Sequence, residues 1–333
     1  DFIGFVDTLR RHFDFSEAAE IAVEIDPRRF SRERAVALGE GGVNRASLGI
    51  QDFDDEVQRA INRLQSFDET RDAVDWLRAA GITGISFDLL YGLPHQTEAK
   101  VLDSIDQALT LEPDRVSLFG YAHVPWVKPH QKLIDDSALP GPALRLKLYR
   151  SAARRLGEAG YVAVGLDHFA RGGDSLAHAA RAGQLRRNFQ GYTTDAADAL
   201  IGLGASALGT LPQGYVQNAP DVPAYRAAIR AGRFATVRGL ALKPDDRVRR
   251  EIISRLMCYL TVDLDDAARV PPGGLDPFAD SLRSLHGLES DGLVRIDGRR
   301  ITVPDEARPA VRAVCATFDS YLGTGVGRHS RAI

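Results

Sequence analysis

The chain of 333 residues is long enough to bury one large core and a second, smaller one. Its formal net charge of −3 gives no indication of a nucleic-acid or anionic-membrane partner. No apolar run is long enough to span a bilayer and no secretory signal is recognisable, so we expect a cytoplasmic protein without membrane insertion. The two cysteines, Cys258 and Cys315, lie far apart in apolar helical stretches and are expected to be reduced core thiols.

The first third of the chain alternates between helical and strand patterns. After an amphipathic stripe over residues 2–13, strands are predicted over 21–26, 45–51, 85–91 and 115–122, each preceded by a helix. Helix N-caps are expected at Ser31, Asp54, Ser66 and Thr97. This alternation predicts a parallel sheet with right-handed crossovers, either open or closed into a barrel.

Polar residues recur where three of these strands end. Glu24, Gln51 and Asp88 all lie at or near the carboxyl ends of their strands, the edge at which such sheets place their ligand chemistry. A single residue of this kind is usually structural, and Asp88 could simply bond nearby backbone amides. Three on successive strands favour a functional rim. By itself the rim would also suit acid–base catalysis in an unrelated barrel hydrolase or isomerase.

Beyond the fourth strand the pattern loosens. A proline-rich connection leads to a helix over about 142–159 and a strand over 161–166, which Asp167, His168 and Phe169 are expected to end. The run at 201–209 is rich in glycine but lacks the GxGxxG spacing, so we reject a dinucleotide site there. Close approach of the backbone to a ligand, or tight packing, remains open.

A composition change near Lys243 predicts two domains, residues 1–242 and 243–333. The second is expected to be mainly helical, with a β-hairpin around Asp297-Gly298. Helices followed by a hairpin suggest a winged helix. Because no basic face dominates the segment, we interpret it as a packing domain and expect no nucleic-acid partner.

Several blocks of the chain resemble the oxygen-independent coproporphyrinogen III oxidases, radical S-adenosylmethionine (SAM) enzymes of haem biosynthesis. The blocks are Glu-Ile-Asp-Pro-Arg at 24–28, Ser-Leu-Gly-Ile-Gln-Asp-Phe at 47–53, Ala-Ile-Asn-Arg at 60–63, Asp-Leu-Leu-Tyr-Gly-Leu-Pro at 88–94, Tyr-Ala-His at 121–123, Asp-His-Phe-Ala at 167–170 and Arg-Asn-Phe-Gln-Gly-Tyr-Thr-Thr at 187–194. The resemblance runs almost from end to end. Related haem chaperones share the barrel motifs, whereas the last block is typical of the oxidases.

The resemblance implies an oxidoreductase that removes two propionate carboxyls of coproporphyrinogen III to give the vinyl groups of protoporphyrinogen IX. A [4Fe-4S] cluster held by three cysteines cleaves SAM, and the resulting 5′-deoxyadenosyl radical takes a propionate β-hydrogen. An electron donor for the cluster and a monomeric full-length protein are also implied. By motif position the residues that contact SAM are Glu24, Gln51, Arg63, Asp88, Ala122 and Leu208. The catalytic residues stay unassigned.

The chain departs from this family in one respect. The Cys-x3-Cys-x2-Cys motif of the cluster is absent and would precede Asp1, and neither cysteine of the chain matches a ligand, so no metal ligand is assigned. We therefore expect an α/β fold, a partial radical-SAM-type (β/α) barrel lacking its first strands, that is inactive alone. A haem or porphyrin carrier without radical chemistry is the alternative. Arginines that could meet porphyrin carboxylates are Arg63, Arg171, Arg186 and Arg187.

Overall fold

The computed structural model describes residues 2–268 and 278–322, which form two compact units that meet at His178 and Ala179. Each unit is treated by itself. The predicted domain boundary after residue 242 falls within the second unit, between a strand and a long helix, and stays a prediction.

The first unit contains a six-stranded sheet and the helices that connect its strands. Its helices are α1 (Phe2–His12), α2 (Arg32–Glu40), α3 (Asp55–Ala60), α4 (Phe67–Ala79), α5 (Glu98–Thr110) and α6 (Pro142–Glu158), with short 3-10 turns η1 (Pro27–Arg29), η2 (Pro129–Leu133) and η3 (Asp136–Ala138). The helix α7 (Ser175–Arg181) begins in this unit and continues into the second. Its strands are β1 (Ala22–Ile25), β2 (Arg45–Gln51), β3 (Gly84–Tyr91), β4 (Arg115–Gly120), β5 (Tyr161–Val164) and β6 (His168–Arg171). The spatial order is β1-β2-β3-β4-β6-β5.

The four predicted strands of the first third are confirmed, and they pair in parallel. Ser31, Asp54, Ser66 and Thr97 all accept hydrogen bonds from the first turns of their helices, as expected. Within the described residues β1 pairs with β2 alone, so it is an edge strand of the sheet.

The predicted strand over 161–166 is confirmed for residues 161–164 and is wrong for the last two. The chain turns at Gly165, whose φ of 59° lies in the left-handed region that favours glycine, and returns as β6. β5 and β6 pair antiparallel, and β6 pairs antiparallel with β4. His168 therefore begins a strand, where the sequence analysis placed it at the end of one.

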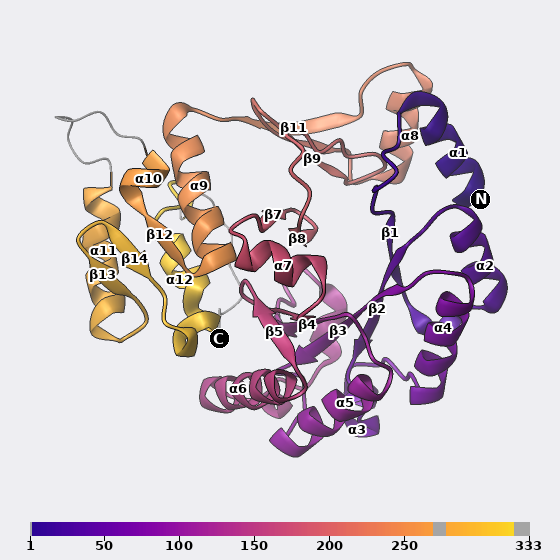
Figure 1. The fold of residues 1–333 in the computed structure, drawn as a ribbon, viewed down its shortest axis with the longest axis horizontal. Helices are drawn as coiled ribbons and strands as arrows, with labels where there is room; N and C mark the ends of the chain where they lie inside the picture. The colour runs from indigo at the N-terminus through magenta and orange to yellow at the C-terminus, as the bar shows by residue number, and fades with distance from the viewer. Residues whose placement is uncertain (1, 269–277, 323–333) are drawn as a thin grey trace. The chain divides into compact units, whose positions relative to one another are not determined.

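The sheet has one apolar face and one polar face. Along β2 buried residues alternate with partly exposed ones, so Leu48 and Ile50 point into the core while Ser47 and Gln51 point to the other side. The apolar side chains pack in one cluster with Leu77 of α4 and equivalent residues of α5 and α6. Figure 1 shows these helices around the outer side of β2–β4. The polar face of the sheet takes no part in this packing.

The second unit is built from three small sheets and several helices. Its strands are β7 (Arg186–Asn188), β8 (Gly191–Thr193), β9 (Leu208–Leu211), β10 (Gly214–Asn218), β11 (Thr236–Ala241), β12 (Thr261–Asp263), β13 (Arg295–Asp297) and β14 (Arg300–Thr302). Its helices are α8 (Val222–Arg230), α9 (Pro244–Tyr259), α10 (Leu264–Ala268), α11 (Ala279–Ser290), η4 (Asp305–Ala310) and α12 (Val311–Ala316). The sheets are a β7–β8 hairpin, β11-β10-β9 and β12-β14-β13.

The predicted hairpin near Asp297 is confirmed, with Asp297 paired to Arg300 across the two-residue turn. The glycine-rich run at 201–209 leads into β9, a strand that the sequence analysis did not predict. A Cβ on Gly202 would stand 2.7 Å from the Leu208 carbonyl oxygen, and one on Gly209 would stand 2.9 Å from a methyl carbon of Val216. These two glycines therefore allow the backbone to pack tightly. Tight packing was one of the two roles left open for this run, the other being close approach of the backbone to a ligand.

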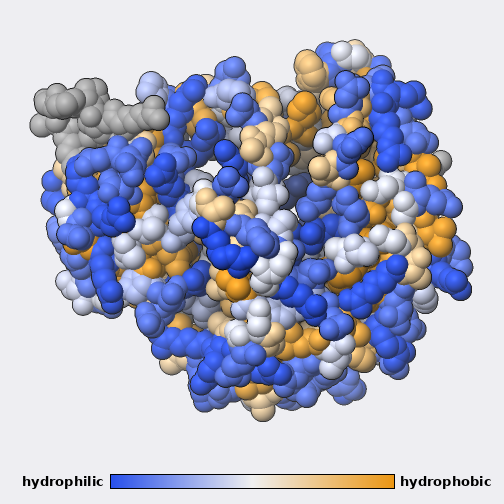
Figure 2. Space-filling view, in the orientation of Figure 1, coloured by the Kyte–Doolittle hydropathy of each residue, from blue (hydrophilic) through white to orange (hydrophobic). Residues whose placement is uncertain are grey.

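Among the described residues no helix combines the length and the apolar composition needed to cross a bilayer. On the face drawn in Figure 2, hydrophilic residues are interspersed with smaller hydrophobic patches.

A buried ion pair ties β4 to the turn that precedes α7. The Arg115 guanidinium donates to both carboxylate oxygens of Asp174, at 2.9 and 3.0 Å, and to the hydroxyl of Ser175 at 3.0 Å. The two charged side chains are only 9% and 5% exposed. Asp174 also lies 3.7 Å from Arg45, so its removal would leave the two arginines with the half-exposed Glu20 as their remaining carboxylate, 2.9 Å from Arg45 and 4.0 Å from Arg115.

We predict that Asp174→Asn lowers the free energy of unfolding by about 3 kcal/mol, because the Arg115 charge stays buried and loses its nearest carboxylate, keeping only Glu20 at 4.0 Å. Urea denaturation followed by circular dichroism measures this. The control is Arg59→Ala, which breaks a pair with Asp55 that is 68% and 77% exposed, and should change stability by less than about 1 kcal/mol. Equal effects of the two substitutions would contradict the prediction.

Candidate functional site

A line of polar side chains crosses the sheet on its polar face. In register, Glu24 of β1 pairs with Ser47 of β2, Asp88 of β3 pairs with Ser117 of β4, and Ser117 pairs with His168 of β6. The Ser47 hydroxyl donates to the Asp88 carboxylate at 3.3 Å. The structure thus brings Glu24 and Asp88 to one face, as the sequence analysis predicted.

The pKa of the Asp88 carboxyl is raised above its ordinary value. Burial raises its pKa, the hydroxyl of Ser117 and the nearby His168 lower it, and the charge of Glu24 raises it. His168 is held by Asp167, whose carboxylate lies 2.8 Å from Nδ1, and its ring meets Phe119 edge-on. A carboxyl that is partly desolvated and surrounded by hydroxyls favours a cationic or hydroxyl-bearing ligand, which would replace the lost hydration.

Gln51 ends β2 in a strained conformation. Its φ of 74° lies in the left-handed region, which costs a residue other than glycine roughly 1–2 kcal/mol. The register with β3 shifts between Gly49 and Gln51. A Cβ on Gly49 would stand 3.1 Å from Nε2 of Gln51 and 3.4 Å from Nη2 of Arg63, so the missing side chain lets the two polar groups gather there. Strain of this kind is concentrated at functional sites.

Arg63 is fixed beside Gln51 by hydrogen bonds to β2 and to the end of β1. Its Nη2 donates to the Gly49 carbonyl at 2.7 Å and to Asp26 Oδ1 at 3.3 Å. Its Nε is buried and has no hydrogen-bond partner among the described residues. A buried donor without an acceptor is costly, and a ligand oxygen at this point would satisfy it.

The carboxyl ends of β2 and β3 are joined by a buried carboxylate that the sequence analysis did not single out. Asp52 is 1% exposed and accepts from Gln96 Nε2 at 2.6 Å, from the Ser104 hydroxyl at 2.9 Å and from the Asp54 amide at 2.7 Å. The same Gln96 amide donates to the Leu90 carbonyl at 2.8 Å. These bonds fix the backbone directly after Gln51 and near the end of β3.

The two other predicted contact residues lie apart from this cluster in the chain. Ala122 follows the end of β4, and its carbonyl accepts from Nε2 of the buried Gln131 at 3.1 Å. Leu208 lies on β9 of the second unit and is 37% exposed. The structure therefore gathers Glu24, Gln51, Arg63 and Asp88 on the first unit's sheet, and their assignment to SAM stays a prediction, like that of Ala122 and Leu208.

The described residues contain no group of histidine, cysteine or acidic side chains arranged to hold a metal ion. Cys258 and Cys315 are buried free thiols. Burial raises their pKa values to about 11 and about 12, which keeps both protonated at neutral pH. Two buried thiols are fewer than the three thiolates that the resemblance implies for the cluster, so these cysteines do not suit it.

The pKa of Asp26 allows the electrostatic interactions among the polar side chains around Arg63 to be tested. Hydrogen bonding from Arg28, with a further contribution from the charge of Arg63, lowers this pKa from 3.8 to about 2. A lowered carboxyl pKa stabilises the fold above pH 3.8, and this contribution is lost as the pH falls through about 2. We predict that Asp26→Asn destabilises the protein by less than about 1 kcal/mol at pH 7, since the pair is partly exposed.

The stability difference between the two proteins should remain constant from pH 7 to about pH 4 and shrink toward pH 2. Urea denaturation at several pH values measures it. A difference that increases on acidification would contradict this prediction.

Comparison with known proteins agrees with the geometry. Residues 1–108 match the model of the radical SAM superfamily. The chain is 51% identical over 332 residues to the oxygen-independent coproporphyrinogen III oxidase of Bradyrhizobium diazoefficiens, covering 100% of the chain and 74% of that relative. It is 45% identical over 321 residues to the enzyme of the same name from Paracoccus denitrificans, covering 96% and 71%.

A solved structure is also similar over most of the chain. Coproporphyrinogen III oxidase (HemN) from Escherichia coli, described as a radical SAM enzyme, matches with a TM-score of 0.89 and 38% identity. The match covers 96% of this chain and 74% of that one. The predicted radical-SAM-type α/β fold is thereby confirmed. The chain belongs to the oxygen-independent coproporphyrinogen III oxidases, a family of radical SAM enzymes.

Proposed function

We propose that the chain forms the SAM- and substrate-facing part of an enzyme that converts two propionates of coproporphyrinogen III into the vinyl groups of protoporphyrinogen IX without oxygen. The observation that carries this proposal is the 51% identity, along the whole chain, to a relative named for that oxidase. The polar cluster on the sheet supports it, since it offers carboxyl, amide and guanidinium groups at one rim.

The reaction is an oxidative decarboxylation. Each propionate loses one hydrogen atom from the carbon attached to the ring, the bond to its carboxylate breaks with release of CO2, and one further electron passes to an electron acceptor as the double bond forms. SAM supplies the hydrogen-abstracting radical when it is bound and reduced, and an electron donor is required. A cytoplasmic location is proposed with this function, and the two buried free thiols suit a reducing compartment.

The residues proposed to contact SAM suit its functional groups. Arg63 could pair with a carboxylate through the buried Nε that lacks a partner. The carboxyls of Glu24 and Asp88 could accept from an ammonium or from ribose hydroxyls, and Gln51 could donate or accept through its amide. Ala122 and Leu208 would offer backbone groups or apolar contact.

The residues of the chain do not fit the iron–sulfur cluster. Its ligands are thiolates, and both cysteines of the sequence are buried and protonated. We therefore propose that the 333-residue chain alone is inactive, while the SAM-contacting cluster on β1–β3 stays competent to bind.

Anaerobic reconstitution with ferrous iron and sulfide tests this directly. We predict that the chain takes up no stoichiometric four-iron cluster and does not cleave SAM, because it lacks three available thiolates. Iron and sulfide analysis, the visible absorption spectrum and chromatography of SAM products are the measurements. A stoichiometric cluster that supports SAM cleavage would disprove the proposal of inactivity.

Two substitutions at Gln51 separate the effect of backbone strain on stability from the effect of the side-chain amide on SAM binding. Gln51→Ala and Gln51→Gly both remove the amide, but only glycine relieves the left-handed φ, so the glycine variant should be more stable by about 1 kcal/mol. Both should weaken SAM binding several-fold in equilibrium dialysis. Wild-type affinity in either variant would remove Gln51 from the proposed contacts.

A porphyrin carrier without radical chemistry is the second candidate, and the unsuitability of both cysteines as cluster ligands favours it. Titrations with haem and with coproporphyrinogen discriminate between the two functions. A carrier should prefer the metallated ring, whereas a fragment of the oxidase should prefer coproporphyrinogen.

A further inference from the structure

The second unit contains a cavity of about 370 Å³ whose lining includes three arginines, Arg186 and Arg187 of β7 and Arg250 of α9. None of the three forms an ion pair with any residue of the described ranges 2–268 and 278–322. Guanidinium groups that share one small cavity repel each other, and the repulsion is relieved when an anion binds between them. The cavity is therefore a candidate site for carboxylates.

The acidic side chains around the cavity do not neutralise these arginines. Glu251 is paired with Arg255 at 2.7 Å. The carboxylate of Asp195 accepts from the Ala197 amide at 2.9 Å, and Asp198 makes no ion pair within the described part of the chain. All three acidic groups line the cavity, but none lies at ion-pair distance from Arg186, Arg187 or Arg250.

One of the arginines is held in place by the unit itself. The guanidinium of Arg187 lies 5.7 Å above the ring of Tyr192, and the hydroxyl of that tyrosine donates to the Met257 carbonyl of α9 at 2.8 Å. This anchors the β7–β8 hairpin to the helix that carries Arg250. The ordering of the Arg187 guanidinium is thus largely complete before a ligand arrives.

The cavity also offers an apolar surface. Phe189 and Tyr215 line it and meet edge-on with their ring centroids 5.4 Å apart, and Phe189 is 49% exposed. An aromatic pair beside guanidinium groups suits a ligand that joins a flat apolar ring to carboxylates. The volume suits one or two substituted pyrroles of a tetrapyrrole rather than the whole macrocycle.

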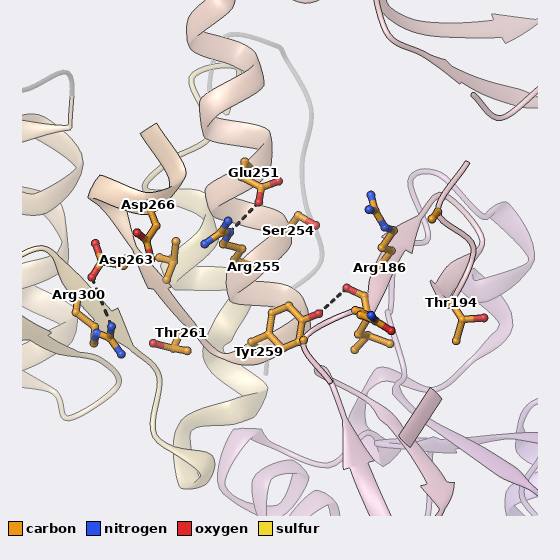
Figure 3. A pocket seen from close by; sticks show the side chains of 15 residues that line it. Arg186, Thr194, Glu251, Ser254, Arg255, Tyr259, Thr261, Asp263, Asp266 and Arg300 are labelled. Carbon is orange, nitrogen blue, oxygen red and sulfur yellow. Dashed lines mark hydrogen bonds and ion pairs between the residues drawn. The ribbon is translucent and has the colours of Figure 1, made fainter. Parts of the chain in front are cut away.

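Arg186 also borders a second cavity of about 730 Å³, which shares Glu251 and Ser254 with the first. Figure 3 shows Arg186 on the β7 side of this space, across from Glu251, Ser254 and Arg255 of α9. The hydroxyl of Tyr259 donates to the Leu185 carbonyl at 2.9 Å and fixes the residue before Arg186. Arg186 can therefore be reached from both cavities.

We propose that the cavity lined by Arg186, Arg187 and Arg250 binds propionate side chains of the porphyrinogen that are not decarboxylated. The three arginines are specificity-determining residues that select porphyrinogens in which these propionates are free carboxylates. The inference rests on the proposed function, because that function supplies a ligand with two propionates that remain intact.

The test measures porphyrin binding and does not require an active enzyme. The probes are coproporphyrin III, which carries four propionates, mesoporphyrin IX, which carries two, and the tetramethyl ester of coproporphyrin, which carries none. Quenching of porphyrin fluorescence gives each dissociation constant. Mesoporphyrin IX keeps the two propionates that the reaction leaves intact, so we expect it to bind through the cavity as coproporphyrin III does, and the ester to bind weakest.

Arg186→Gln, Arg187→Gln and Arg250→Gln should each weaken coproporphyrin III binding roughly 10- to 100-fold, as expected for a charge-assisted hydrogen bond. They should weaken the binding of mesoporphyrin IX by a similar factor, because it carries the same two propionates, and should leave the weak binding of the ester unchanged. The matched control is Arg238→Gln on β11, an exposed arginine that lines neither cavity and should leave binding unchanged. Thermal melts check that every variant is folded.

The outcomes separate the two proposals. Failure of the wild-type chain to bind coproporphyrin III would overturn both. Wild-type binding that is unaffected by the three substitutions, or is weakened equally by Arg238→Gln, would overturn this inference and leave the proposed function standing. Displacement of coproporphyrin III by inorganic phosphate at comparable concentration would show a general anion site and would also overturn it.

Discussion

The buried carboxylate of Asp52 is the constraint on which the rim of the first unit depends. Desolvation raises its pKa, and three donors from three different segments compensate for the water it has lost. Because one of these donors, Gln96, also bonds the Leu90 carbonyl, the ends of β2 and β3 are held as one piece. A polar network of this kind is stabilising only when every member is satisfied, so it specifies a single arrangement of the loops.

The hydrogen bonds of Asp52 explain how the sheet tolerates the unfavourable backbone conformation of the neighbouring residue, Gln51. Gln51 keeps a left-handed φ because the residue after it is anchored by the network and the residues before it belong to a paired strand. The strain places the amide of Gln51 near Arg63. The stability is provided by the apolar face of the same sheet, where β2, β3 and β4 bury their side chains under the helices.

Much of the first unit was predictable because its signals are local. The strands from β1 to β4 show clear periodicity, and Ser31, Asp54, Ser66 and Thr97 identified the helix starts by a side chain that caps its own first turn. β6 was missed because the apolar run continues past the turn at Gly165, and only the φ of that glycine separates the two strands. β11 was missed because all its residues are exposed, which leaves no burial pattern to detect.

The candidate site could be predicted from the sequence only in part. Glu24, Gln51 and Asp88 were identified by their predicted place at or near strand ends, although Asp88 lies three residues before the end of β3, and Arg63 only by resemblance to the family. The role of Asp52 could not be inferred, since its partners Gln96 and Ser104 lie 44 and 52 residues away and carry no mark of the contact. The cavity of the second unit depends in the same way on a contact between β8 and α9 that no local pattern encodes.

The position of β1 at the edge of the sheet has a further consequence. Along its outer side the backbone amides and carbonyls have no ladder partner in residues 2–268 or 278–322, so they form a template for one more strand. A strand that docked there would turn Glu24 from a border residue into a central one and shield its carboxyl from water. The electrostatic character of the cluster on β1–β3 would then be governed by whichever polypeptide completes the ladder.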